Sequence, residues 1–247
     1  MDYQEIQATG FLSNFIKCFW KYEHTQDDTE HTILPDACFD LIVDFKNGIL
    51  KDISLTGVWA KPINVTVTKG TTFFAIRFKI IAAEYILKRE IKSILNTMVS
   101  LPSDFWNLNT ISCNEFEKFI NTLSCQMALS LKHLKVIDDR KLKLFDLIYN
   151  KGYYNVKNIS ENVHWSSRQI NRYFDQQYGF PLKTLLNIVR CNTSYKNIAQ
   201  GKLYPTKEYT DQAHFIKEIK KYTENTPSQL SKNKNDRFLQ LSTISEK

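Results

Sequence analysis

The first part of the chain alternates between apolar and polar positions in the way that strands do. Between Asp36 and Phe45 the apolar positions recur at every second residue, while Asp40 and Asp44 fall on the opposite face. Lys46-Asn47-Gly48 predicts a turn. Residues 65–68 and 72–78 are β-branched and aromatic. The first 80 residues are therefore expected to form an antiparallel β-sheet.

From Ala82 onward the pattern becomes helical. It is strongest over residues 114–134, where the apolar positions follow at three- and four-residue steps: Phe116, Phe119, Ile120, Leu123, Met127, Leu131 and Leu134. Such a stripe packs a helix onto its own domain or forms the seam of a dimer, and both interpretations stay open here. After Asp138 only helices are predicted, the first over residues 141–151 and ended by Gly152.

Composition narrows the classes of protein. The chain has 247 residues, of which 43% are hydrophobic and 24% charged, as in a soluble protein of one large or two small domains. No apolar run approaches the ~20 residues of a membrane helix, and the N-terminus lacks an apolar signal core. Five widely spaced cysteines without C-x-x-C indicate reduced thiols and no zinc site. We therefore expect a cytoplasmic protein.

The positive charge is confined to the C-terminal part. Residues 138–247 hold 19 Lys and Arg against 11 Asp and Glu, whereas the first 137 residues hold 14 against 15. A localised positive field suits a module that binds a polyanion, because neutralised phosphates release counterions. A solvated lysine-rich surface gives the same count. The asymmetry favours two domains with different roles.

One segment, residues 156–174, predicts a helix-turn-helix. A short helix precedes a corner at His164-Trp165, and Ser166 can cap a second helix. On that second helix Ser167, Arg168, Asn171 and Arg172 share the polar face. Arg and Asn are the side chains that read guanine and adenine with paired hydrogen bonds. The alternative is a plain helical hairpin with polar surface residues.

The order of motifs over residues 142–233 resembles the AraC/XylS family of bacterial transcription regulators. The matching residues are Ile159, Ser166-x-Arg168-x-Ile170-x-Arg172-x-Phe174, Gly179, Lys183-Thr184, Ile188-Val189-Arg190, Tyr209-x-Asp211-Gln212-Ala213-His214-Phe215-Ile216-Lys217-Glu218 and Thr226-Pro227-Ser228.

This resemblance implies an α+β fold of two domains. The first, residues 1–137, is mainly antiparallel β with helices and serves sensing or dimerisation. The second, residues 138–235, is an all-α double helix-turn-helix of homeodomain-like units joined by a long helix over residues 182–198. Residues 236–247 form a C-terminal tail.

The resemblance also assigns the DNA contacts. In the first unit the base readers are Arg168, Asn171 and Arg172, flanked by Ser167 and Gln169. In the second, Asp211 caps the helix, and the residues facing DNA are Gln212, Ala213, Ile216 and Lys217. His214 touches the DNA backbone or supports packing. Lys220 and Lys221 are candidates for phosphate contacts, although solvated lysines would look the same.

The second unit departs from the family pattern. Only residues 202–207 separate Gly201 from Glu208, where the family places a supporting helix, and Pro205 would break one. Glu208 and Glu224 stand where glycines are usual. We therefore expect the first unit to supply most of the base specificity.

The first half resembles an uncharacterised domain found ahead of AraC-type DNA-binding regions. The matching pieces are Phe19-Trp20, Leu34-Pro35-Asp36-x-Cys38-x-Asp40-Leu41, Gly57 and Ile76-Arg77-Phe78. Trp20, Trp59 and Arg77 are candidate ligand residues, with Arg77 suited to an anion. The alternatives are burial of both tryptophans and an ion pair of Arg77 with Asp36 or Asp40. The histidines His24, His31 and His133 lack the spacing of a metal site.

The resulting hypothesis is a sequence-specific DNA-binding transcription regulator, an activator or a repressor, modulated by a ligand or by dimerisation. Double-stranded DNA is the expected partner; RNA polymerase, a small-molecule effector and a second copy of the chain are further candidates, and no cofactor is expected. The alternative is a ligand-sensing or protein-interaction scaffold with reduced DNA specificity. An enzyme is not expected, because G-x-S-x-G, P-loop, G-x-G-x-x-G and H-E-x-x-H motifs are missing.

Overall fold

The computed structural model describes residues 2–132, 137–205, 209–232, 238 and 241. Residues 2–132, here called the sheet half, begin with seven strands: β1 (Asp2–Gln7), β2 (Ile16–His24), β3 (Thr29–Ile33), β4 (Cys38–Lys46), β5 (Ile49–Thr56), β6 (Ile63–Val67) and β7 (Thr71–Lys79). An eighth, β8 (Met98–Ser100), completes a six-stranded antiparallel sheet in the order β1-β2-β7-β4-β5-β8. Strands β3 and β6 pair separately as a two-stranded ribbon.

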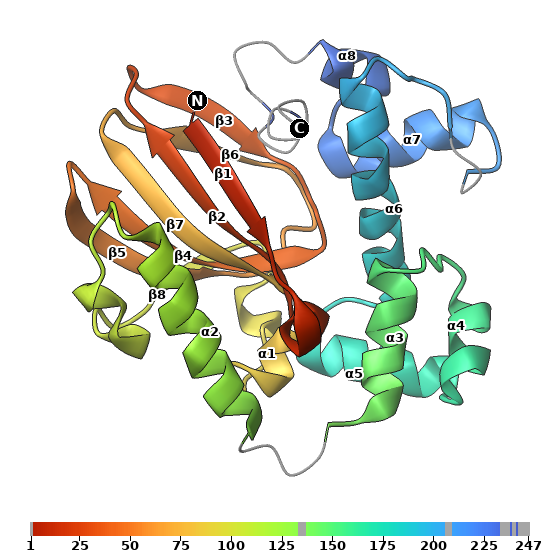
Figure 1. The fold of residues 1–247 in the computed structure, drawn as a ribbon. Coiled ribbons are helices and arrows are strands. Elements are labelled where there is room, and N and C mark those ends of the chain that lie inside the picture. Colours follow the sequence, from red (N-terminus) through yellow and green to blue (C-terminus); the bar gives the residue numbers. More distant parts are fainter. Residues whose placement is uncertain (1, 133–136, 206–208, 233–237, 239–240, 242–247) are drawn as a thin grey trace.

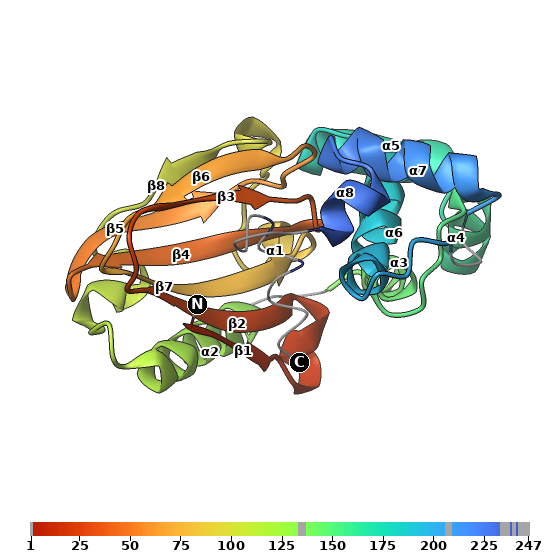
Figure 2. The same cartoon turned by 90° about the horizontal axis from the view of Figure 1, so that it is seen from above.

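The two faces of the large sheet pack against different layers. On β4 the side chains at odd positions, Phe39 to Phe45, are at most 1% exposed, as the alternation predicts. They face the helix α2 (Phe116–Lys132), whose Phe119 ring lies 5.6 Å from that of Phe74. The β3–β6 ribbon covers the other face (Figure 2). The apolar stripe of α2 therefore serves the sheet half itself, while Leu134 lies outside the described residues.

The segment between residues 82 and 113 differs from the helical expectation. Only α1 (Ala82–Tyr85) is α-helical there, followed by short 3-10 turns and β8. Left-handed backbone at Lys88 and Asn96 bends the chain so that its apolar residues enter the core from irregular loops. Gly57 permits this course, because a Cβ at that position would lie 1.8 Å from the Ile94 carbonyl oxygen. Tertiary packing has overridden the local periodicity.

The helical half, residues 137–232, contains the remaining six labelled helices: α3 (Asp139–Tyr149), α4 (Val156–Val163), α5 (Ser167–Tyr178), α6 (Leu182–Ala199), α7 (Gln212–Thr223) and α8 (Pro227–Ser231). Helix α6 forms its axis, with α3, α4 and α5 at one end and α7 and α8 at the other (Figure 1). The long helix expected over residues 182–198 is thus present. No helix among the described residues is long and apolar enough to cross a membrane.

Three hydrogen bonds tie the helical half to the turn before β4. Tyr149 of α3 donates its hydroxyl to the carbonyl of Ala37 (2.6 Å), and Tyr195 of α6 donates to that of Pro35 (3.1 Å). Asn192 of α6 donates its amide to the carbonyl of Asp36 (3.3 Å). Ala37 adopts left-handed backbone with φ of 63°. Three consecutive backbone carbonyls therefore connect the two halves.

Of the expected C-terminal tail, residues 236–247, the structure describes Phe238 and Leu241. Both side chains are buried, and Phe238 forms an isolated parallel bridge with Thr32 of β3. This part of the tail packs against the sheet half.

Candidate nucleic-acid interface and ligand cavity

Helices α4 and α5 are joined by a corner of three residues. The Asn155 side chain accepts hydrogen bonds from the backbone of Lys157 and Asn158 and so begins α4. His164 ends α4 in left-handed backbone with φ of 52°. Ser166 then caps α5 by accepting a hydrogen bond from the Gln169 backbone N–H, and the Gln169 side chain accepts one from the Ser166 backbone N–H, which completes a capping box. The expected corner and the Ser166 cap are both confirmed.

Helix α5 has one buried and one exposed face. Its buried side chains are Ile170, Phe174 and Tyr178. Arg168, Gln169 and Arg172 are exposed, and Ser167 is half-buried. The Gln169 side chain is engaged in the capping box, so Arg168 and Arg172 are the basic groups that the exposed side of α5 presents, next to the equally exposed Asp175 and Gln176.

Asn171 has a structural role in addition to its place on α5. Its Oδ1 accepts a hydrogen bond from the backbone N–H of Leu182 (3.1 Å), the first residue of α6. Pro181 precedes α6 without a side chain that could cap it. The Asn171 side chain therefore satisfies a backbone donor at the start of α6, which fixes the orientation of its amide.

The C-terminal part of α5 packs on the sheet half. Tyr173 donates its hydroxyl to Glu84 of α1 (2.9 Å) and contacts the Tyr178 hydroxyl (2.7 Å). The backbone N–H of Ile91 donates to the carbonyl of Gln177 (3.0 Å). Arg168 and Arg172 remain exposed, so the sheet half fixes the helix without covering them.

Helix α7 is held against α6 by an ion pair. Arg190 Nη2 lies 2.8 Å from Glu218 Oε2, and the side chains are 13% and 14% exposed. Asp211 caps α7 by accepting from the backbone of His214 (2.8 Å), as expected. Phe215 and Ile219 are buried beneath it. The cap, the ion pair and the apolar contacts together fix the orientation of α7.

Helix α7 has six exposed side chains, and two of its residues bond the loop before it. The exposed side chains are Gln212, Ala213, Ile216, Lys217, Lys220 and Lys221. Gln212 donates its amide to the Leu203 carbonyl (2.9 Å), and His214 Nδ1 accepts from the Thr210 backbone (3.3 Å) while its ring packs on Tyr209. His214 therefore supports packing, one of its two expected roles. No helix precedes α7 in the described residues 202–205 and 209–211.

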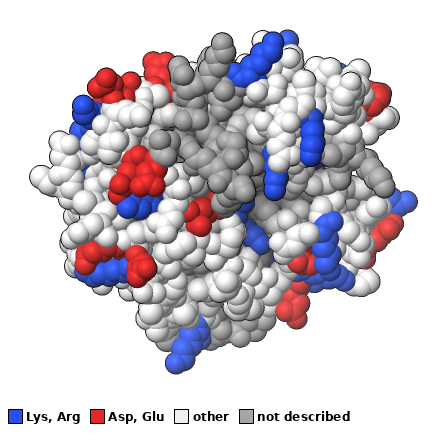
Figure 3. All heavy atoms as spheres, turned by 45° about the horizontal axis from the view of Figure 1, so that its top comes forward, with Lys and Arg blue, Asp and Glu red and all other residues white. Residues whose placement is uncertain are grey.

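Charge is distributed unevenly over the surface. On the face drawn in Figure 3, acidic side chains gather over the sheet half and basic side chains over the helical half. This agrees with the concentration of Lys and Arg after residue 138.

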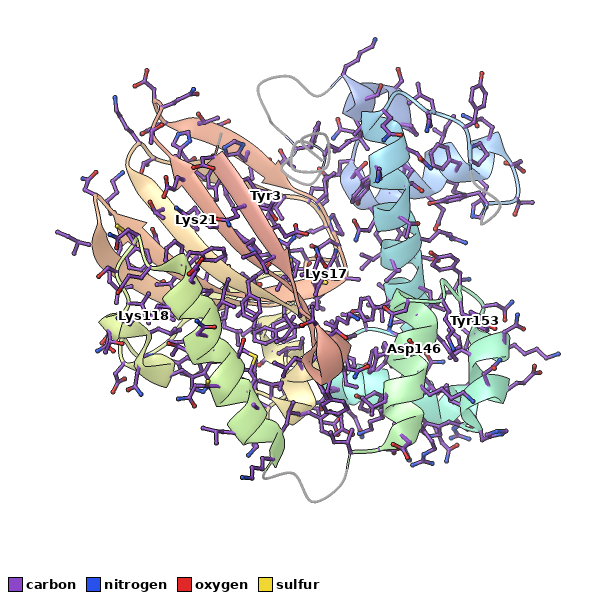
Figure 4. The ribbon with its side chains drawn as sticks, viewed as in Figure 1. Tyr3, Lys17, Lys21, Lys118, Asp146 and Tyr153 are labelled. Carbon is purple, nitrogen blue, oxygen red and sulfur yellow. The ribbon has the colours of Figure 1, made fainter. Side chains whose placement is uncertain are left out.

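A cavity of about 250 Å³ lies between the large sheet and the β3–β6 ribbon. Its walls include Trp20, Trp59 and Arg77, the three ligand candidates of the sequence, so the fold brings them together. Tyr3 of β1, labelled in Figure 4, and Phe73 of β7 add aromatic surface. Carboxylates reach the cavity from the neighbouring strands β4 and β5: Asp40, Asp44 and Asp52.

Arg77 pairs with both carboxylates named as alternatives to a ligand. Its Nε donates to Asp40 Oδ1 (3.0 Å), and its Nη1 lies 3.4 Å from Asp36 Oδ2. Trp20 donates its indole N–H to the same Asp40 oxygen (3.0 Å). Burial raises the pKa of Asp40, and Asp36 adds to this rise, while Arg77 and Trp20 lower it. The guanidinium thus holds two buried acids in place.

Some residues of these sites were not identified from the sequence. Asp44 was predicted only to face away from the apolar side of its strand, and Asp52 was not singled out. The reason is that the ribbon covering both residues is distant from them in sequence. No sequence pattern marked the residues that bond the turn before β4, because their partners are backbone carbonyls: Tyr149, Asn192 and Tyr195. Among the described residues, no group of His, Cys, Asp or Glu side chains is arranged to hold a metal ion.

Comparison with known proteins gives a partial match. Residues 4–100 match the model of a domain of unknown function, DUF6597. No curated protein matches the sequence. A solved structure of ToxT from Vibrio cholerae is 13% identical, with a TM-score of 0.42 over 93% of this chain and 97% of that one.

Two further ToxT structures from Vibrio cholerae are similar at the same remote level. An apo variant is 11% identical, with a TM-score of 0.40 over 85% of this chain and 96% of that chain. The form bound to an unsaturated fatty acid is 10% identical, with a TM-score of 0.34 over 85% and 92%. The family match itself spans the strands β1 to β8 and ends before the helical half begins.

Proposed function

We propose that this protein is a sequence-specific DNA-binding transcription regulator with two helix-turn-helix units. In this proposal residues 138–235 form the DNA-binding domain, and α5 and α7 are the recognition helices. Residues 1–137 form a regulatory domain whose cavity holds a small-molecule effector. The observation that carries the proposal is the presentation of Arg168 and Arg172 on the exposed face of α5.

Arg168 and Arg172, like the exposed Arg89, form no ion pair among the described residues, whereas three other arginines do: Arg77, Arg140 and Arg190. Arg168 and Arg172 stand one helical turn apart on a firmly capped helix. A guanidinium in this state is available for a paired contact with the O6 and N7 atoms of guanine. Asn171 stays a predicted contact through its Nδ2.

The arrangement of the helices supports a double-unit interface. Helices α5 and α7 lie at opposite ends of α6 and run in the same direction in both ribbon views. Helix α6 has 18 residues and is therefore about 27 Å long. Successive major grooves on one face of DNA recur about every 34 Å. We propose that two helices at opposite ends of a connecting helix of this length enter adjacent major grooves.

The two units have different strengths as base readers. The proposed first unit is capped at both helices, whereas no helix supports α7 in the described residues before it, and Gln212 and His214 already bond their own loop. We propose that Lys217, Ala213 and Ile216 contact the second groove weakly and that Lys220 contacts phosphate. Specificity then rests mainly on Arg168 and Arg172.

Selection of duplexes from a random library with the full-length chain tests this proposal. We expect an enriched site with one strong block, read by α5, and a weaker block about ten base pairs away. Arg172→Ala should cost about 1–3 kcal/mol on that site and far less on random DNA. Lys118→Ala, on α2 of the sheet half (Figure 4), is the matched loss of one positive charge and should change neither.

Two results would contradict the proposal. Equal losses on selected and random DNA would make Arg172 a phosphate contact only. Salt-dependent DNA binding that Arg172→Ala leaves unchanged would favour the scaffold in place of a sequence reader.

A further inference from the structure

The cavity of the sheet half is acidic rather than basic. The charged side chains that line it are three carboxylates, Asp40, Asp44 and Asp52, and one guanidinium, Arg77. Resting on the proposed regulatory role of this cavity, we propose that its ligand is an organic cation with an aromatic or apolar body. An anionic ligand, which Arg77 alone would suggest, is the alternative that the following contacts oppose.

The positive charge of Arg77 is already engaged. Asp40 and Asp36 share the guanidinium, at 3.0 and 3.4 Å, and the Arg77 side chain is only 16% exposed. An anion that took this guanidinium would displace a buried carboxylate and leave it without a partner. Removing one partner from a buried ion pair is costly because the remaining charge is desolvated. Arg77 therefore organises the cavity wall and does not attract an anion.

The other two carboxylates face each other and have only one solvent-exposed lysine as a counter-charge in the described part of the chain. Asp44 of β4 and Asp52 of β5 are directly opposite each other in the antiparallel pair, where like charges repel. The counter-charge of Asp44 is Lys51, at 3.3 Å, whose side chain is 64% exposed. Asp44 Oδ1 is buried and has no hydrogen-bond partner among the described residues. A cation in the cavity would offset the repulsion between the two acids.

The remaining walls suit the body of such a ligand. Trp20, Trp59 and Phe73 line the cavity together with apolar residues of the β3–β6 ribbon. The faces of aromatic rings attract cations, most strongly where water is excluded. Trp20 already has the Arg77 guanidinium over its ring at 5.7 Å, so Trp59 is the indole left to a ligand, beside the rings of Tyr3 and Phe73. Aromatic walls and two facing acids with one solvent-exposed lysine between them together select a cation.

Isothermal titration calorimetry of the full chain with three probes of one ring system tests the ligand class. The probes are tryptamine, a cation; indole-3-ethanol, which is neutral; and indole-3-acetate, an anion. We expect tryptamine to bind about tenfold more tightly than the alcohol, because the attraction between its ammonium and a cavity carboxylate raises the affinity by about that factor. The anion should bind more weakly than both, because the same carboxylates repel it. Asp44→Asn and Asp52→Asn should each reduce the preference of tryptamine over the alcohol.

Controls separate a local effect from misfolding. Asp104→Asn removes an exposed carboxylate from the same half outside the cavity and should leave the preference unchanged. Thermal unfolding of each variant reports its folding, and two independent cavity variants keep the test valid if one fails to fold. Tighter binding of indole-3-acetate, an unchanged preference in both cavity variants, or no binding of any probe would overturn the inference.

The test is independent of DNA. If tryptamine binds as described but no DNA site is selected, the proposed function fails and the cation site stands. If a DNA site is selected but the anion binds best, the reverse holds.

Discussion

Arg77 and Asp36 join the cavity to the helical half. Arg77 Nη1 lies 3.4 Å from the Asp36 carboxylate, and the backbone carbonyl of the same Asp36 accepts a hydrogen bond from Asn192 of α6 (3.3 Å). One residue thus contacts a cavity wall through its side chain and the axis of the proposed DNA-binding domain through its backbone. We therefore expect a shift of Arg77 on ligand binding to reach the turn that α3 and α6 contact.

Coupling between the two sites is the first prediction. Tryptamine at saturation should change the affinity for the selected DNA site by about fivefold or more, and DNA should change the tryptamine affinity by the same factor. Tyr195→Phe removes the hydrogen bond to Pro35 and should reduce this factor while both ligands still bind. Tyr204→Phe, at a position 82% exposed, is the control. Calorimetric titrations with and without the other ligand measure both factors, whose equality checks the data; a factor near one in each direction would contradict coupling.

The second prediction concerns the ion pairs of Arg77. Arg77→Met should lower the free energy of unfolding by about 3–5 kcal/mol, because Asp36 and Asp40 would remain buried without a counter-charge. Asp40→Asn in the same chain should restore part of the loss, since it removes one of the two charges. Urea unfolding of both variants gives these values. Arg140→Met breaks an exposed pair and should change stability little; a loss as large as that of Arg77→Met would contradict the role of burial.

The third prediction concerns the contact between α3 and the turn before β4. The Tyr149 hydroxyl donates to the Ala37 carbonyl at 2.6 Å and accepts from the Ile80 backbone at 3.4 Å. Tyr149→Phe leaves both backbone groups without this partner and should lower the free energy of unfolding by about 1–3 kcal/mol. Tyr204→Phe makes the same chemical change at an exposed site and should have almost no effect. Equal effects in urea unfolding would mean that the hydroxyl of Tyr149 does not contribute.

The fourth prediction is a pH dependence from Asp44. Burial raises the pKa of this carboxyl and Asp52 raises it further, while Lys51 and Lys46 lower it. The folded chain thus holds the proton more tightly than the unfolded chain, so the contribution of Asp44 to stability is present below its unfolded pKa and is lost as the pH rises through its folded pKa. The stability of the natural chain relative to Asp44→Asn should therefore fall as the pH rises from below the ordinary aspartate pKa of about 3.9 toward neutrality.

Urea unfolding of the two chains across this range measures the fourth prediction. Other titrating groups cancel in the difference, and Asp104→Asn should show no such trend. A difference that stays constant with pH would mean that the environment of Asp44 does not favour its protonated form.

The elements with a strong local signal were predicted well from the sequence. Alternation identified the inward face of β4, three- and four-residue steps identified α2, and Ser166 and Asp211 marked the starts of α5 and α7. The prediction of helix was wrong over residues 86–113. There the apolar side chains enter the core from loops, so they are buried without the spacing of a helix. Local periodicity carries no information about such a segment.

The contacts between distant segments were beyond sequence reasoning for a different reason. Trp20, Trp59 and Arg77 were expected near one another from their chemistry, but the acids Asp44 and Asp52 acquire meaning only when the β3–β6 ribbon covers them. Asn171 was read as a base contact, although its Oδ1 is bonded to the start of α6. An asparagine side chain can bond a DNA base or the protein backbone, and its residue type alone does not tell which.

The three hydrogen bonds to the turn before β4 also bear on how related chains would diverge. Tyr149, Asn192 and Tyr195 supply the donors, whereas the acceptors at positions 35, 36 and 37 are main-chain carbonyls that every amino acid possesses. Substitution in the turn therefore leaves the acceptors in place as long as the left-handed backbone at position 37 is kept. In a family with this architecture, the side chains that specify this contact would all lie in the helices, and the turn could change its own side chains, and with them its link to the cavity, while the docking onto the turn is preserved.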